Sequence, residues 1–221
     1  MDAELKPFID KANAALKDVV LKTTDKFEFG NRLTRYKEMA LGDFITDAMV
    51  SYVESTGVKV DGAITNGGGI RAELPKGDVT RENILTVLPF ENYVYVLTLK
   101  GSDVVKLFDF IGSVKQGAGA FAQVSKNIRY TITYDKDGNG KVSNITIGGK
   151  PIDVNRTYRI ATNDYMAKSG DGYTVFTTAI DTYNTSMLIS TVVIEYAATL
   201  KGAVTPSTDG RINVIGGTLP Q

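Results

Sequence analysis

The stretch that decides the fold is residues 41–71, LGDFITDAMVSYVESTGVKVDGAITNGGGIR. Its first half repeats apolar residues at the spacing of one helix face, and Gly57 follows where a helix usually ends, which predicts a helix over about 41–55. Residues 58–65 then predict a short buried strand. Residues 66–71 would therefore lie at the carboxyl end of a strand, the edge at which open α/β sheets usually bind their ligands.

Helical and alternating apolar patterns continue along the rest of the chain. They predict helices over about 3–20, 80–88, 104–111 and 188–200, and strands over about 93–99, 128–134, 142–147, 158–162 and 211–215. Helices and strands interleave and one hairpin is antiparallel, so we expect an α/β (mixed α+β) fold in which mixed β-sheets and helices form layers. No internal repeat or change of composition marks a boundary, which predicts a single domain over residues 1–221.

The leading segment, residues 1–20, is predicted to contain an amphipathic helix whose apolar stripe includes Leu5, Phe8 and Ile9. Such a stripe needs a partner. We expect it to pack on the core of the domain; the alternative is a linker helix that bridges to a preceding domain.

Composition excludes several classes of function. Lys plus Arg and Asp plus Glu number 25 each, and this balance argues against a general nucleic-acid binder, so no nucleic-acid polymer is expected as a partner. No apolar run reaches the length of a signal-peptide core or a membrane span, so no membrane contact by this chain is expected. Cysteine is absent, which excludes disulfides, thiolate metal sites and cysteine nucleophiles.

The chain also contains no histidine. Metal sites that hydrolyse phosphate esters usually use imidazole ligands or a histidine acid, and serine triads need histidine as the base. We therefore predict no catalytic residue, no metal site and no cofactor in this chain. A carboxylate pair is the alternative source of acid–base chemistry, with Asp164 and Asp171 as the nearest candidates.

The segment DKDGNG at residues 135–140 imitates the start of a calcium-binding loop. However, Thr146 occupies the twelfth position, where such loops carry glutamate, and no helix is predicted on either side. A turn rich in Asp, Asn and Gly explains the same residues, and we expect a turn.

What remains is a set of residues suited to recognition. The glycine triplet 67–69, with Gly68 at its centre, lets backbone approach a ligand closely, while the Arg71 guanidinium is suited to holding an anion. Phe90 and Tyr165 are predicted in loops at strand ends, beside polar residues rather than inside an apolar periodic run. Two such rings facing each other would clamp a flat base. The alternative is that both rings cap the core.

Four segments in order carry a resemblance to a known family: residues 41–49 (LGDFITDAM), 66–71 (NGGGIR), 89–92 (PFEN) and 163–173 (NDYMAKSGDGY). Together they closely resemble the C-terminal domain of the 5′-nucleotidases, and the resemblance covers nearly the whole chain. In that family, a separate N-terminal metallophosphoesterase domain carries two divalent metal ions and the catalytic histidine. The resemblance implies that this chain, which lacks that domain, binds a nucleotide or nucleoside, with an adenine base expected, and does not cut it.

The resemblance also implies roles for individual residues. Arg35 and Arg71 would hold the phosphate, and Arg32 is a weaker candidate. Phe90 and Tyr165 would stack on the base. Tyr165 stands where phenylalanine is common in the family, but a tyrosine ring stacks equally well.

For the sugar and the edge of the base, the resemblance implies Asn66, Asn92 and Asp171. The two amides would meet the polar edge of the base or the sugar, and the carboxylate would accept hydrogen bonds from ribose hydroxyls. Ser169 and Lys126 depart from the family pattern, since glycine is common at both positions. Ser169 would stiffen its loop, and Lys126 would add a phosphate contact or narrow the pocket.

The family leaves several functions open. Its relatives also cleave 2′,3′-cyclic nucleotides, 3′-nucleotides or nucleotide sugars, and a stand-alone nucleotide-binding module without a catalytic partner is a further alternative. The resemblance also implies that the parent protein is secreted, periplasmic or exposed at the cell surface.

Overall fold

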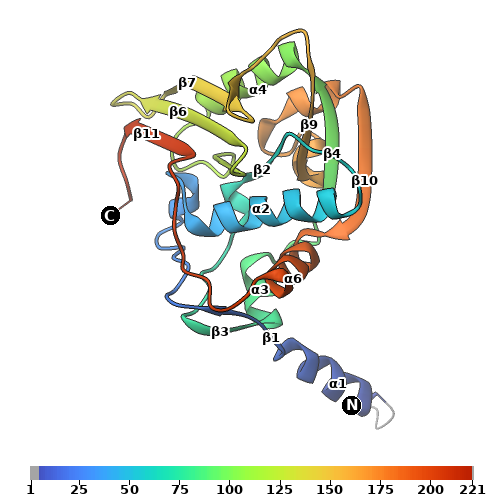
Figure 1. Cartoon of the computed structure of the whole chain (residues 1–221). Helices are drawn as coiled ribbons and strands as arrows, with labels where there is room; N and C mark the ends of the chain where they lie inside the picture. The colour runs from blue at the N-terminus through green and yellow to red at the C-terminus, as the bar shows by residue number, and fades with distance from the viewer. Residues whose placement is uncertain (1–4, 221) are drawn as a thin grey trace.

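The computed structural model describes residues 5–220, in which helices and strands interleave along the chain (Figure 1). The α-helices of these residues are α1 Lys6–Leu16, α2 Ala40–Ser55, α3 Arg81–Val87, α4 Gly101–Ser113, α5 Asp164–Ala167 and α6 Ile189–Thr199. The strands are β1 Val19–Thr23, β2 Gly62–Asn66, β3 Gly77–Thr80, β4 Tyr93–Lys100, β5 Ala122–Val124, β6 Ile128–Tyr134, β7 Gly140–Ile147, β8 Lys150–Pro151, β9 Thr157–Asn163, β10 Asp181–Leu188 and β11 Ile212–Gly216. Short 3-10 helices are η1 Leu33–Arg35, η2 Gly67–Gly69, η3 Gly170–Gly172 and η4 Thr174–Thr178.

The strands form mixed sheets. The central sheet has the order β10-β4-β9-β2-β5, in which β2 and β9 are parallel and the other neighbours are antiparallel. A second sheet has the order β11-β6-β7-β8, with β11 parallel to β6, and β1 pairs with β3. The predicted mixed α/β class is therefore confirmed.

The central sheet separates two hydrophobic clusters, because successive side chains of a strand point to opposite faces. Val94 and Val96 of β4 belong to one cluster, together with apolar residues of α2, α3 and α6. Leu97 and Leu99 of the same strand belong to the other, together with residues of α4 and β6. Figure 1 shows this layering, with α4, β6 and β7 at the top and α3 and α6 at the bottom.

Most of the predicted helices and strands are confirmed within a few residues. α3 begins where predicted because Thr80 forms a capping box: its hydroxyl accepts from the Asn83 N–H, and the Asn83 side chain accepts from the Thr80 N–H. The β6 to β7 turn is also as predicted, since Asp135 Oδ1 accepts the N–H groups of Asp137 and Asn139 at 2.8 and 2.9 Å. These bonds are those of an Asp turn.

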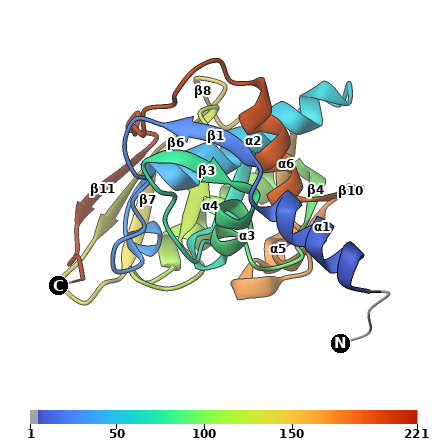
Figure 2. The same ribbon diagram turned by 90° about the horizontal axis from the view of Figure 1, so that it is seen from below.

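The leading helix is shorter than predicted, and it does not pack on the core. α1 ends at Leu16, and Val19 begins β1, which pairs with β3 instead of continuing the helix. None of the residues of α1 is buried, and Phe8 is 74% exposed. Figures 1 and 2 show α1 projecting from the body of the molecule. The β-branched pair Val19 and Val20 favours a strand; residues 3 and 4 of the predicted helix lie outside the described residues.

Some strands differ from prediction or were not predicted. β2 begins at Gly62 rather than Val58, and Asp61 makes the bend: its carboxylate accepts the N–H of Arg159 at 2.8 Å while its own N–H donates to the Arg159 carbonyl. β1, β3, β5, β8 and β10 were not predicted. Several of them are very short, and most of β10 is polar and exposed at the edge of its sheet.

Candidate functional site

One cavity collects all eight residues predicted from the sequence to bind a ligand. Its volume is about 500 Å³, which is within the range of about 300–1,000 Å³ usual for small-molecule sites. The lining residues are Arg35, Asn66, Gly68, Gly69, Arg71, Phe90, Asn92, Gly119, Tyr165 and Asp171. Gly69 belongs to the glycine triplet that was predicted to approach a ligand, whereas Gly119 was not predicted.

The cavity lies where several strand ends meet. β2 and β9 are parallel neighbours, so their carboxyl ends, Asn66 and Asn163, lie at the same edge of the central sheet. η2 follows β2 directly, and α5 follows β9. The segment after β9, where Tyr165 was predicted to lie in a loop, contains α5 and η3, which bring Tyr165 and Asp171 to the cavity.

A chain of hydrogen bonds links the polar side chains of the site. Asn163 Nδ2 donates to Asn66 Oδ1 at 3.0 Å, Asn66 Nδ2 donates to Asp171 Oδ2 at 2.7 Å, and Tyr165 Oη donates to Asp171 Oδ1 at 2.9 Å. Asn163 is buried and caps α5, since its Oδ1 accepts the Met166 N–H at 2.7 Å. Asn163 was not predicted as a site residue, although it is the first residue of the segment 163–173 that carries the family resemblance.

The arginines give the cavity a positive charge. Burial lowers the pKa of the Arg35 guanidinium, the nearby charges of Arg32 and Arg71 lower that pKa further, and Asp171 opposes them. Arg35 Nε is buried and has no hydrogen-bond partner among residues 5–220. An anion in the cavity would relieve the repulsion between these positive charges. Arg32, the weaker candidate, does not line the cavity but contributes its charge.

The two predicted aromatic rings are accessible. Phe90 is 50% exposed and Tyr165 is 46% exposed, so neither ring caps the core. The Arg71 guanidinium lies over the Phe90 ring, 5.8 Å from its centroid, and Arg71 Nη1 donates to the Gly68 carbonyl at 3.3 Å. Asn92, which is half-buried, lies on the same wall two residues after Phe90.

The glycine triplet serves backbone packing as well as the cavity. A Cβ on Gly67 would collide with the Thr34 carbonyl, and one on Gly68 would lie 2.9 Å from Gly119 Cα. The Gly67 and Gly68 N–H groups donate to the carbonyls of Phe121 and Gly119 at 2.7 and 2.8 Å. These two amides are therefore committed within the protein, and the guanidinium groups of Arg35 and Arg71 are the positively charged groups in the lining.

Lys126 lies away from this cavity. It follows β5, whose Ala122 pairs with Asn66, and it comes after the opposite end of that strand. Its N–H donates to Asp47 Oδ1 at 2.8 Å, and its side chain is not part of the lining. The expectation of a phosphate contact from Lys126 has no support in this arrangement.

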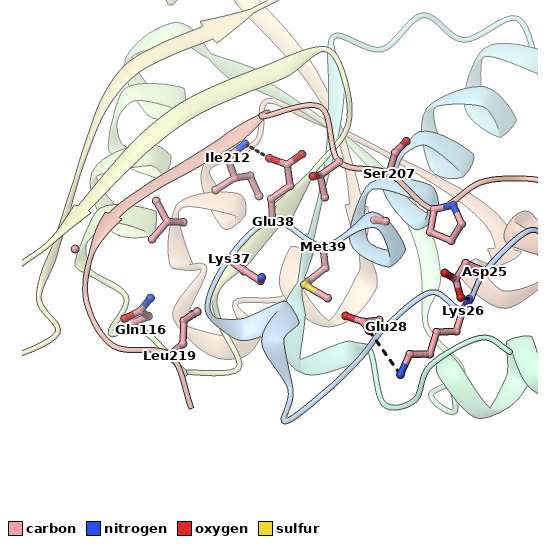
Figure 3. Close-up of a pocket in the computed structure, with 15 residues that line it drawn as sticks. Asp25, Lys26, Glu28, Lys37, Glu38, Met39, Gln116, Ser207, Ile212 and Leu219 are labelled. Carbon is pink, nitrogen blue, oxygen red and sulfur yellow. Dashed lines mark hydrogen bonds and ion pairs between the residues drawn. The ribbon is translucent and has the colours of Figure 1, made fainter. Parts of the chain in front are cut away.

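A second and larger cavity, of about 720 Å³, lies beside the C-terminal segment and contains none of the predicted site residues (Figure 3). Charged side chains of both signs line this cavity, and Lys26 Nζ lies 3.6 Å from Glu28 Oε1 in an ion pair. Glu38 at its floor accepts the N–H groups of Asp209, Gly210 and Ile212 at 2.8 to 3.0 Å. The buried carboxylate thus anchors the C-terminal segment, which is a structural role.

Comparisons with known proteins agree with the architecture. The family model described as "5′-nucleotidase, C-terminal domain" matches residues 19–178. The chain is 37% identical over 188 residues to the trifunctional nucleotide phosphoesterase protein YfkN of Bacillus subtilis, covering 82% of this chain and 13% of that protein. It is 32% identical over 192 residues to the 5′-nucleotidase of Vibrio vulnificus, covering 87% of this chain and 33% of that protein.

The crystal structure of a 5′-nucleotidase precursor from Thermus thermophilus superposes with a TM-score of 0.83 at 29% identity. The superposition covers 97% of this chain and 43% of that one. By comparison, the chain spans a third or less of the length of the Bacillus subtilis and Vibrio vulnificus proteins. On the match to residues 19–178, the chain belongs to the family of 5′-nucleotidase C-terminal domains.

Proposed function

We propose that this chain binds the nucleotide substrate of a 5′-nucleotidase-type hydrolase, whose metal ions and catalytic histidine reside in a separate N-terminal domain. The observation that carries the proposal is the cavity itself. It combines two half-exposed aromatic rings, two lining arginines with an excess of positive charge, and one carboxylate held by hydrogen bonds. Rings, guanidinium groups and a carboxylate suit a base, a phosphate and a ribose, respectively.

The residues of this chain do not fit a catalytic pair of metal ions. Histidine and cysteine are absent from the sequence. Within residues 5–220, no group of three or more carboxylates is arranged to hold a metal ion. By resemblance to the family, we propose that two divalent ions are held by a separate N-terminal domain, and that this chain supplies substrate binding and orientation.

The carboxylate of Asp171 favours a 5′-nucleotide over the alternatives within the family. A negative group that accepts bonds from ribose hydroxyls would repel a phosphate attached to the 2′ or 3′ oxygen. We therefore place 2′,3′-cyclic nucleotides and 3′-nucleotides behind 5′-nucleotides as ligands. An adenine base is proposed by resemblance, as is a periplasmic, secreted or cell-surface location. Across residues 5–220, no helix has the length and apolar character to cross a membrane.

Calorimetric titration with adenosine and AMP tests the proposal. Both ligands should bind, and Tyr165→Ala and Asp171→Ala should each weaken binding of both by about tenfold or more. Arg71→Ala should weaken AMP binding more than adenosine binding, because only AMP carries the phosphate. We expect modest affinity, since the metal ions of the catalytic domain would supply part of the phosphate's binding energy.

The matched controls are Tyr183→Ala and Asp109→Ala, which remove the same residue types from exposed positions outside the cavity. Both should bind like the parent. If neither ligand binds at millimolar concentration, or if the site variants bind as well as the parent, the assignment of the cavity is wrong.

Two other functions are open to direct contradiction. A stand-alone binding module would be excluded by a longer reading frame whose upstream part contains clustered His and Asp codons. An intact enzyme that uses only carboxylates and arginines would release phosphate from AMP in the presence of Mn²⁺, and Asp171→Asn would abolish that release. We expect no release from the pure chain.

A further inference from the structure

Tyr165 contacts Asp171 through its hydroxyl as well as lining the cavity with its ring. Tyr165 Oη donates to Asp171 Oδ1 at 2.9 Å, and the same oxygen accepts the backbone N–H of Asp171 at 3.2 Å. The hydroxyl is therefore both donor and acceptor for one residue. A phenylalanine ring at this position would make neither bond.

Asp171 occupies a backbone conformation that needs support. Its φ is 54°, in the left-handed region, and Ser169 two residues earlier has a φ of 68°. Residues other than glycine adopt this conformation rarely. Between them, Gly170 lies directly against Tyr165: a Cβ there would be 2.5 Å from the Tyr165 carbonyl oxygen and 2.6 Å from two ring carbons. The turn that carries Asp171 is thus built against Tyr165.

The second oxygen of the Asp171 carboxylate is held from the interior. Asn66 Nδ2 donates to Oδ2 at 2.7 Å, and the buried Asn163 fixes Asn66 in turn. The carboxylate is therefore held from the core on one side and from the half-exposed Tyr165 on the other. A carboxylate accepts about four hydrogen bonds. Two are used among residues 5–220, which leaves two acceptor positions, the number that two adjacent hydroxyls require.

We propose that the Tyr165 hydroxyl is a positioning residue for sugar recognition, which holds the Asp171 carboxylate in the orientation that receives a vicinal diol. This role is separate from stacking by the ring. It rests on the proposed function, because the diol is that of a bound ribonucleoside. The site then recognises the sugar with a carboxylate that is fixed before the ligand arrives, and such preorganisation favours binding.

Calorimetry with adenosine and 2′,3′-dideoxyadenosine separates the hydroxyl from the ring. Tyr165→Phe should weaken adenosine binding by about tenfold, the effect of losing a hydrogen bond to a charged group, and should change dideoxyadenosine binding by less than about twofold, because the ring remains. Asp171→Asn should remove most of the preference for adenosine. When Tyr165→Phe is added to Asp171→Asn, adenosine binding should weaken little further, since the two residues act on the same contact with the sugar.

Equal weakening of both ligands by Tyr165→Phe, or no weakening of either, would overturn the positioning role. A second measurement needs no ligand. In ¹⁵N NMR spectra of the free protein, Tyr165→Phe should shift the Asn66 side-chain amide and the Asp171 backbone amide, and the control Tyr183→Phe should shift neither. Unmoved signals in Tyr165→Phe would also contradict the proposal.

The two measurements distinguish the positioning role from the proposed function. Suppose that Tyr165→Phe shifts the NMR signals of the free protein but the parent binds no nucleoside. The proposed function and the recognition of a ribose diol then fail, while the conclusion that Tyr165 holds the Asp171 carboxylate stands. If the parent binds adenosine but Tyr165→Phe moves no signal and loses no preference, the proposed function stands and the positioning role fails.

Discussion

Gly67 is fixed by its neighbours at the scale of single atoms. The carbonyl of Thr34 occupies the place where a Cβ of residue 67 would lie, and the Thr34 hydroxyl donates to the Gly67 carbonyl at 3.1 Å. The triplet therefore joins η1 to the end of β2, which brings Arg35 beside Asn66 in one cavity. A side chain at residue 67 would separate the two walls of the site.

We predict that alanine substitutions in the glycine triplet 67–69 lower the free energy of unfolding by different amounts at different positions. Gly67→Ala should lower the free energy of unfolding by about 2–3 kcal/mol, because overpacking against rigid backbone has no room to relax. Gly69→Ala is the matched control: its Cβ would meet the Asn66 side chain, with Oδ1 at 3.3 Å and Cγ at 3.9 Å, and the free energy of unfolding should fall by less than about 1 kcal/mol. Urea denaturation measures both. Equal losses would show that the Thr34 contact is not what requires glycine.

All eight residues predicted from the sequence line one cavity, but the sequence did not predict the hydrogen bonds that connect them. Phe90 and Tyr165 were identifiable because large rings lay beside polar residues outside any apolar period. The bond from Asn66 to Asp171 spans 105 positions and exists only because β2 and β9 are parallel neighbours. A pattern read within one window carries no information on that pairing, and Asn163, which supports Asn66, was missed for the same reason.

At the scale of elements, α2 begins with a buried acid. Asp43, in its first turn, is 4% exposed, and neither of its oxygens accepts a hydrogen bond within the described residues. Burial raises the pKa of Asp43 to about 9; the Arg211 guanidinium, 3.4 Å from Oδ1, opposes this, and the nearby Glu38 and Asp209 add to it. Arg211 itself donates to Asp47 and Asp209. This one arginine thus faces several carboxylates, and a proton on Asp43 lowers the repulsion.

This proton makes stability depend on pH. An unfolded Asp releases its proton above a pH of about 4, whereas the folded protein keeps the proton on Asp43 up to about pH 9. The stabilisation is therefore full below about pH 4 and is lost as the pH rises through about 9. Asp43→Asn, which imitates the protonated side chain, should be more stable than the parent at pH 8.5 by about 1 kcal/mol or more.

Urea denaturation at several pH values between 5 and 9 tests this prediction. The parent should lose stability across that range relative to Asp43→Asn, while the exposed control Asp109→Asn should follow the parent. Parallel curves for Asp43→Asn and the parent would show that Asp43 is ionised in the folded protein and that Arg211 holds it.

The elements differ in how far their sequence reveals them. α2, α4 and α6 were predictable because their buried apolar residues recur at helical spacing. β10 was not, because it lies at the edge of the central sheet with most side chains exposed, so no alternation of apolar residues marks it. Its place is set by pairing with β4, which is a tertiary contact.

For the whole molecule, the layered body begins at β1. Leu21 of β1 is buried in the cluster that contains α2 and α6, whereas no residue of α1 is buried. The role of α1 as a linker from a preceding domain, and the assignment of residues 1–221 to one domain, stay predictions. The exposed apolar stripe of α1 is consistent with a covering partner, but stability of the body should not depend on it.

Removing residues 1–17 tests that boundary. Because α1 buries no residue, the shortened chain should unfold within about 1 kcal/mol of the parent in urea, and it should bind AMP with the same affinity. Leu21→Ala in the full chain is the contrasting variant, since truncating a buried leucine should cost about 2–5 kcal/mol. If truncation lowered the free energy of unfolding as much as Leu21→Ala does, α1 would pack against the body in solution, as the sequence alone had suggested.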